Sequence, residues 1–124
     1  MSSGYADVNG IKLYHEIYGQ GEPLVLIHGG LTTIGEIQGW VQPLAKTRRV
    51  IAVEMQGHGR TADTDRPMSF ATMGDDIAAL LDHLKIPKAE LGFSMACGPM
   101  AHLSGATPAT KRLVPSMRKA LFLV

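Results

Sequence analysis

Residues 24–30 read Leu-Val-Leu-Ile-His-Gly-Gly, four uninterrupted apolar residues followed by a glycine-rich turn. An apolar run without polar alternation is typical of a strand that is covered on both faces, as in the parallel sheet of an α/β protein. Residues 50–53, Val-Ile-Ala-Val, repeat the pattern and lead into a second glycine-rich stretch. Two such strands predict an α/β fold with a mostly parallel sheet.

The segment before these strands predicts a β-hairpin over residues 4–18. Asn9-Gly10 supplies the positive φ angles of a tight turn. Apolar and polar residues alternate from Ile11 to Ile17, as in a strand with one buried face. At the other end of the chain, residues 120–124 are a further candidate for a short strand.

Two helices are expected to connect the central strands. The first has an apolar stripe at helical spacing, formed by Ile37, Trp40, Val41 and Leu44, and contains Pro43. The second, stronger helix begins after Ser69, a good N-cap, and ends before Pro87. Its expected core face is Met73, Ile77, Leu80, Leu81 and Leu84, and its expected outer face is Asp75, Asp76, Asp82 and Lys85.

Three glycine-containing segments follow the predicted strands: residues 28–30, residues 56–60 and residues 92–95. The last follows a short strand candidate at residues 89–91. In open parallel sheets the chemistry gathers beyond the carboxyl ends of the strands. We therefore expect these three segments to form the functional site.

The last segment reads Gly92-Phe93-Ser94-Met95-Ala96, one residue away from the Gly-x-Ser-x-Gly nucleophile elbow. In that motif a sharp turn between strand and helix lifts the serine hydroxyl into the cleft. Ala96 is the smallest substitute for the final glycine, so the turn could survive with slight strain. Taken alone, the pentapeptide also fits an ordinary turn.

The turn at residues 28–30 could direct backbone N–H groups into the same cleft. Acyl transfer develops negative charge on the carbonyl oxygen, and preorganised donors there lower the barrier by roughly 3–4 kcal/mol each. The alternative interpretation is a glycine-rich connection between a strand and a helix.

The order and spacing of these motifs over about residues 5–96 resemble the α/β-hydrolase family. The resemblance implies a partial α/β-hydrolase fold with flanking helices, in which Ser94 is the nucleophile. It further implies an oxyanion hole made by the backbone N–H groups of Gly30 and Met95. The residues that it implies to be structural parts of the motifs are His28, Gly29, Gly57, Gly59 and Gly92.

The function implied is that of a serine hydrolase acting on carboxylic esters or related acyl compounds, without cofactor or metal. The serine would attack the carbonyl, and water would then hydrolyse the acyl-enzyme. A relative of the haloperoxidase or dehalogenase type is a close variant, and serine at position 94 argues against dehalogenation.

The chain departs from the family pattern after Ser94. The family order is Ser, then Asp or Glu, then His, but no acid follows Ser94 and the one later histidine is His102. Residues 97–124 form an irregular tail with prolines. We therefore expect residues 1–124 to be a single, incomplete domain that is truncated, frame-disturbed or engineered. The alternative function is that of a catalytically incompetent remnant that folds partially or self-associates through exposed sheet edges.

Composition gives a weaker guide to partners and location. A net charge of +1, with 45% hydrophobic and 19% charged residues, fits a soluble globular protein without a pull toward nucleic acid or membrane. Residues 95–124 contain four Lys or Arg and no acid. A further alternative is therefore that this basic tail binds nucleic acid. The single cysteine, Cys97, and the lack of a signal peptide favour the cytoplasm. His15 and His83 are expected to be ordinary surface residues.

Overall fold

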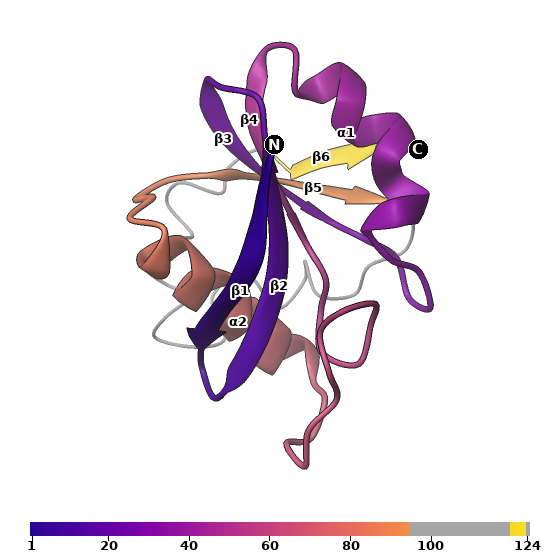
Figure 1. Ribbon diagram of the computed structural model, residues 1–124, viewed down its shortest axis with the longest axis vertical. Coiled ribbons are helices and arrows are strands. Elements are labelled where there is room, and N and C mark those ends of the chain that lie inside the picture. The colour runs from indigo at the N-terminus through magenta and orange to yellow at the C-terminus, as the bar shows by residue number, and fades with distance from the viewer. Residues whose placement is uncertain (95–119, 124) are drawn as a thin grey trace.

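The computed structural model describes residues 1–94 and 120–123. These residues form one six-stranded sheet in the order β1-β2-β4-β3-β5-β6 (Figure 1). β1 pairs with β2 and β2 with β4 in antiparallel fashion, whereas β4, β3, β5 and β6 run parallel. The strands are β1 (Ser2–Val8), β2 (Ile11–Tyr18), β3 (Glu22–Ile27), β4 (Arg48–Val53), β5 (Glu90–Ser94) and β6 (Ala120–Leu123). The predicted α/β class with a mostly parallel sheet is confirmed.

The predicted hairpin is present at the amino end of the chain. Its turn places Asn9 and Gly10 at φ angles of 49° and 82°, the pair of positive values that such a turn needs. The ladder runs from Val8 opposite Ile11 to Ser2 opposite Ile17. The hairpin thus extends the parallel strands by two antiparallel ones, with β1 at the edge.

The two apolar runs form the centre of the sheet, as predicted. β3 lies between β4 and β5, and all of residues 24–27 and 50–53 are buried. Alternate residues of each strand enter different clusters, because successive side chains point to opposite faces of a sheet. Leu24 and Leu26 join one cluster, while Val25 and Ile27 join the other.

One face of the sheet is covered by a short helical segment, η1 (Ile34–Ile37) followed by α1 (Gln38–Leu44). Thr33 caps η1 in a capping box with Glu36. The predicted apolar stripe is only partly correct. Val41 packs into the cluster on this face, but Trp40 is 36% exposed because it lies on the outer side of α1.

The opposite face is covered by α2 (Phe70–His83) (Figure 1). Ser69 caps it as predicted, since the Thr72 N–H donates to the Ser69 hydroxyl at 3.1 Å. The helix gives way to Lys85, which has a φ of 57°, ahead of Pro87. The predicted core residues Ile77, Leu80 and Leu81 are buried against the strands.

Asp76 contradicts the predicted outer face of α2, because its exposure is 0%. It binds the Arg66 guanidinium through both carboxylate oxygens at 2.8 Å and accepts a further bond from the Asn9 amide. A charged group tolerates burial only when it is paired and hydrogen-bonded in this way. The sequence pattern of α2 carried no sign of these partners.

The prediction for His15 was also wrong, whereas His83 is exposed as expected. His15 lies on β2, which is an interior strand between β1 and β4, and it is 8% exposed. Burial lowers the pKa of His15, because the charged imidazole is deprived of water. The burial of His15 follows from the pairing of β2 with β4, a tertiary contact that the sequence pattern does not reveal.

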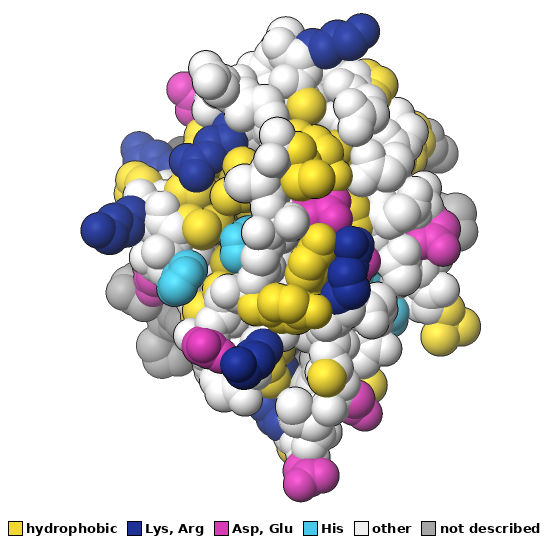
Figure 2. Space-filling model, viewed as in Figure 1, with side chains coloured by type: hydrophobic (Ala, Val, Ile, Leu, Met, Phe, Trp, Pro, Cys, Tyr) yellow, Lys and Arg dark blue, Asp and Glu magenta, His cyan; other side chains and the backbone are white. Residues whose placement is uncertain are grey.

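Charges of both signs are interspersed with apolar side chains on the face shown in Figure 2, in keeping with the small net charge. Among the described residues, no helix is long and apolar enough to span a bilayer. The predicted strand at residues 120–124 is present as Ala120–Leu123. Met95, Cys97, His102 and the basic residues of the tail up to position 119 lie outside the described residues.

Candidate functional site

The three glycine-containing segments meet at the carboxyl edge of the parallel strands, as expected. Ile27 of β3 lies opposite Val53 of β4 on one side and opposite Phe93 of β5 on the other. The next residues along the three strands are His28, Glu54 and Ser94. Because neighbouring strands are about 4.8 Å apart, this register brings the backbone of Ser94 level with that of His28. Ser94 is the last residue of β5, and Met95 lies outside the described residues.

The loop after β3 is held by its own backbone amides. Every N–H from residue 31 to residue 36 donates a hydrogen bond to a nearby oxygen or ring nitrogen. Gly29 is buried, whereas Gly30 is exposed. Within the described part of the chain the Gly30 N–H donates no hydrogen bond. Hydrogen bonds therefore fix the loop backbone on the carboxyl side of Gly30, next to the Gly30 amide.

Leu31 is the most unusual residue of this loop. Its φ is 61°, a left-handed conformation that residues other than glycine rarely adopt, and its side chain is 98% exposed. Its N–H donates to Nε2 of His58 at 3.3 Å. A contact between residues 27 positions apart in the sequence thus fixes the amide of a strained residue.

His28 joins the loop after β3 to the loop after β4. Its Nε2 accepts from the Met55 N–H at 3.0 Å, and Nδ1 lies 2.7 Å from the carbonyl oxygen of Gly29. Nδ1 therefore carries the proton in the neutral ring. Burial lowers the pKa of His28, which favours that neutral form. These contacts make His28 a connection between the two loops.

The glycines of the second segment have distinct structural roles. Gly57 and Gly59 have φ angles of 73° and 52°. A Cβ on Gly59 would lie 2.3 Å from Cδ of Glu54, so a side chain cannot be accommodated there without movement. Gly92 lies within β5 opposite Leu26 and is buried.

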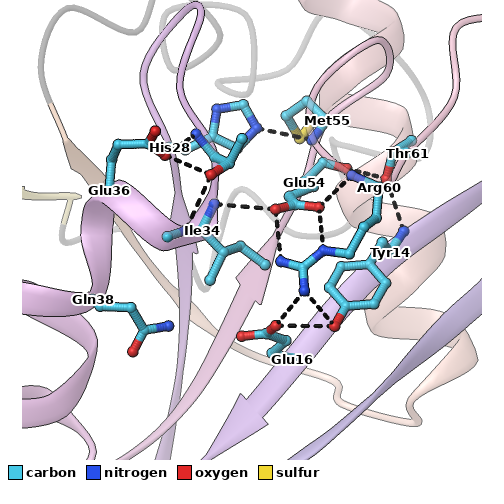
Figure 3. Close-up of polar contacts among 12 residues, drawn as sticks. Tyr14, Glu16, His28, Ile34, Glu36, Gln38, Glu54, Met55, Arg60 and Thr61 are labelled. Carbon is cyan, nitrogen blue, oxygen red and sulfur yellow. Dashed lines mark hydrogen bonds and ion pairs between the residues drawn. The ribbon is translucent and has the colours of Figure 1, made fainter.

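A cluster of polar residues lies beneath these loops, and the sequence analysis missed it (Figure 3). At its centre Glu54 is 1% exposed and binds Arg60 through Nε and Nη2 at 3.0 and 2.9 Å. The Arg60 guanidinium also reaches Glu16, and its Cζ lies 3.9 Å from the centre of the Tyr14 ring. We call these four residues the Glu54 cluster. The sequence feature that could have predicted this cluster is the position of Glu54 directly after a buried strand.

The Glu54 cluster contacts the candidate site through one further bond. Oε1 of Glu54 accepts from the Ile34 N–H at 3.2 Å, at the start of η1. Burial alone would raise the pKa of Glu54, but hydrogen bonds from Arg60 and from the Ile34 amide hold it below its usual value. A charged Glu54 therefore fixes the far end of the loop that contains Gly30.

A second polar cluster, Arg66, Asp76, Gln56 and Asn9, joins the connection between β4 and α2 to the hairpin turn. Gln56 accepts from Arg66 through Oε1 and donates to the Arg66 carbonyl and to Asp63. We call it the Asp76 cluster. No group of three or more His, Cys, Asp or Glu side chains in residues 1–94 is placed to hold a metal ion.

The chain matches known proteins over most of its length. A family profile described as the alpha/beta hydrolase fold covers residues 22–116. The dihydrolipoyllysine-residue acetyltransferase component of the acetoin cleaving system of Pseudomonas putida is 38% identical over 109 residues, which is 83% of this chain. The soluble epoxide hydrolase of Corynebacterium sp. strain C12 is 34% identical over 86 residues, or 67% of this chain.

The matched region is a minor part of those relatives, since it spans 29% of the length of each. Among solved structures, an N-acyl homoserine lactone degrading enzyme superposes with a TM-score of 0.77 at 28% identity. That superposition covers 98% of this chain and 44% of the other.

Proposed function

Because this chain belongs to the α/β-hydrolase fold family, whose matched members include hydrolases, we propose that it hydrolyses carboxylic esters or related acyl compounds with Ser94 as the nucleophile. The observation that carries the proposal is the arrangement at the carboxyl edge of the sheet. Ser94 ends β5 in register with the residue that begins the loop after β3. In that loop Gly30 is exposed and its N–H donates to none of the described residues, while the N–H groups of residues 31–36 all donate hydrogen bonds.

The reaction would proceed in two stages. The Ser94 oxygen attacks the carbonyl carbon of the substrate, and the carbonyl oxygen becomes an oxyanion that accepts hydrogen bonds from the Gly30 and Met95 N–H groups. As the bond to the leaving alcohol breaks, the proton of the Ser94 hydroxyl is transferred to the alcohol oxygen, and the acyl group remains on Ser94. Water then attacks the acyl-enzyme and releases the acid. A fixed loop favours this chemistry, because donors that are already oriented need no reorganisation as charge develops.

The choice of an acyl substrate has two supports. Serine is a nucleophile for acyl transfer when a base activates it. One solved structure that superposes on 98% of this chain is that of an N-acyl homoserine lactone degrading enzyme, and a lactone is a cyclic ester. An epoxide would be the alternative substrate class, since the Corynebacterium relative is an epoxide hydrolase.

The proposal is tested by hydrolysis of p-nitrophenyl acetate by the chain and by the Ser94→Ala variant. We expect turnover, or a burst of one equivalent, that falls to the background rate in Ser94→Ala. Ser2→Ala is a matched control, because Ser2 is exposed at the start of the edge strand. Equal rates in the wild type and Ser94→Ala would contradict the proposal, and faster consumption of an epoxide would reassign the substrate.

A second candidate function is self-association through the sheet edge. It is favoured by β1, a seven-residue strand whose outer edge is unpaired within the described residues. Gly4→Lys would place a charge on this strand at a position where a Cβ meets no atom within 4 Å. We expect light scattering to show a dimer or larger species that dissociates in Gly4→Lys. A monomeric wild type would exclude this candidate.

A further inference from the structure

The loop after β3 contains a strained residue that its own side chain does not anchor. Leu31 has a φ of 61° and its side chain is 98% exposed, so no packing contact holds the backbone in this conformation. A left-handed conformation at a non-glycine residue persists only where the surroundings impose it. Two sets of contacts do so here: the Thr32 N–H and hydroxyl both donate to the Gly29 carbonyl and close a turn across residues 30 and 31, and the Leu31 N–H donates to His58.

The hydrogen bonds of His58 determine its protonation. Nδ1 lies 2.9 Å from the carbonyl oxygen of Gln56, which can only accept, so Nδ1 carries the proton. Nε2 then has a free lone pair in the neutral ring, and this lone pair accepts from the Leu31 N–H. A second proton on Nε2 would direct one N–H at another and eliminate the bond.

The surroundings of His58 connect it to both loops. Its ring lies against that of His28, with the ring centres 4.7 Å apart and the planes at 42°. Glu54, after β4, and Glu36, in η1, both act on His28 through space, and the charged residue Arg60 lies two positions after His58. The ring contact therefore joins the two histidines that connect the loop after β3 to the loop after β4.

We propose that His58 is a positioning residue, whose neutral imidazole holds the Leu31 amide and thereby fixes the neighbouring Gly30 N–H, and that protonation of His58 releases this hold. The catalytic consequence rests on the proposed function, since Gly30 is an oxyanion donor only if the chain performs acyl transfer. The structural claim concerns the loop alone. The loop is held at a pH at which His58 is neutral and is released as the pH falls and the ring gains a proton.

The structural claim is tested by an NMR titration of the ¹⁵N-labelled chain between about pH 5 and pH 8, the range in which histidine changes charge. We expect the Leu31 amide signal to shift with the same midpoint as the His58 ring signals. In the exposed-histidine control His83→Gln the Leu31 shift should keep that midpoint. A Leu31 signal that does not follow the ionisation of His58 would overturn the inference.

Two variants separate positioning from general stability. In His58→Gln an amide oxygen can still accept from Leu31 without titrating, so the Leu31 signal should stay near its wild-type position at all pH values. In His58→Phe the acceptor is lost, and kcat for p-nitrophenyl acetate should fall roughly tenfold or more with little change in KM, because the oxyanion donor is displaced. Rescue of kcat by Gln, but not by Phe, would support the inference.

The two proposals fail in different ways. If the chain shows no Ser94-dependent turnover and Leu31 still follows His58, the proposed function fails and the positioning role stands. If Ser94-dependent turnover is present but is equal in His58→Phe and His58→Gln at every pH, the positioning role fails and the proposed function stands.

Discussion

Two buried carboxylates, Glu54 directly after β4 and Asp76 within α2, are each bound by an arginine through two nitrogens. The difference lies in what else each carboxylate holds. Glu54 accepts from the Ile34 N–H and so reaches the loop that contains Gly30. Asp76 accepts from Asn9 in the hairpin turn, on the side of the sheet covered by α2. The same ion-pair chemistry therefore supports the candidate site in one place and the fold alone in the other.

The largest expected effect is that of Asp76→Ala. Removal of the carboxylate leaves the partly buried Arg66 without its charged partner, which should lower the free energy of unfolding by about 3–5 kcal/mol. Urea denaturation followed by circular dichroism measures this change, with the exposed Asp65→Ala as a control near zero. If Asp76 supports only the fold, the Leu31 amide shift of the folded protein should remain at its wild-type value. A displaced Leu31 signal would break the distinction between the two clusters.

The next largest loss of stability is expected for Gly59→Ala. The new Cβ meets the Glu54 carboxylate carbon at 2.3 Å, and alanine must also adopt a φ of 52°. Together these effects should cost about 2–4 kcal/mol of unfolding free energy. Gly39→Ala is the matched control, for which the change in unfolding free energy should have the opposite sign. Gly39 lies in α1, and no atom lies within 4 Å of a new Cβ there. Alanine there should stabilise by about 0.5–1 kcal/mol.

Glu54→Gln should have a smaller effect on stability but a larger effect on the site. The change weakens hydrogen bonds to a charged partner, at a cost of about 2 kcal/mol. The Ile34 amide signal should move, and hydrolysis should slow. Glu22→Gln, at an exposed glutamate of β3, should change neither. An unchanged Ile34 signal in Glu54→Gln would remove the proposed link between the Glu54 cluster and the loop.

The pH dependence of the same variant sharpens this comparison. The pKa of Glu54 is lowered in the folded protein, so at acid pH the unfolded chain binds the proton more readily. Its contribution to stability is complete above the ordinary glutamate pKa of about 4.3 and is lost as the pH falls through the lowered value. The wild type should therefore lose its stability advantage over Glu54→Gln on acidification, as measured by urea denaturation across pH 3–7. A difference independent of pH would contradict this assignment.

The parts of the fold that the sequence predicted are those that depend on local signals. The buried runs at residues 24–27 and 50–53, the Asn9-Gly10 turn and the Ser69 cap were all identified, because each is determined by a few neighbouring residues. The burial of Asp76 was not, since its partner Asn9 is 67 positions away. His15 was misplaced for a related reason, because the pairing of β2 with β4 is a tertiary feature.

The candidate site likewise has parts that local sequence signals predict and parts that depend on tertiary contacts. Order and spacing indicated Ser94, Gly30 and His28 as residues that meet beyond the strands, and the register of β3 and β5 brings the backbones of His28 and Ser94 to the same level. The contact of His58 with Leu31 depends on how two loops cross at the edge of the sheet, which no local pattern encodes. Met95, the second oxyanion donor that the family resemblance implies, lies outside the described residues and remains a prediction.

The Asn9 bond to Asp76 also has a kinetic consequence. The hairpin turn, Arg66 and α2 must all be in place before this cluster can form, and a contact that closes 67 residues of chain carries a large entropic cost early in folding. We therefore expect the cluster to assemble after the rate-limiting step. Contacts that form late leave the folding rate almost unchanged and slow the reverse reaction instead. The Asp76 cluster should thus slow unfolding and so determine how long the native state persists.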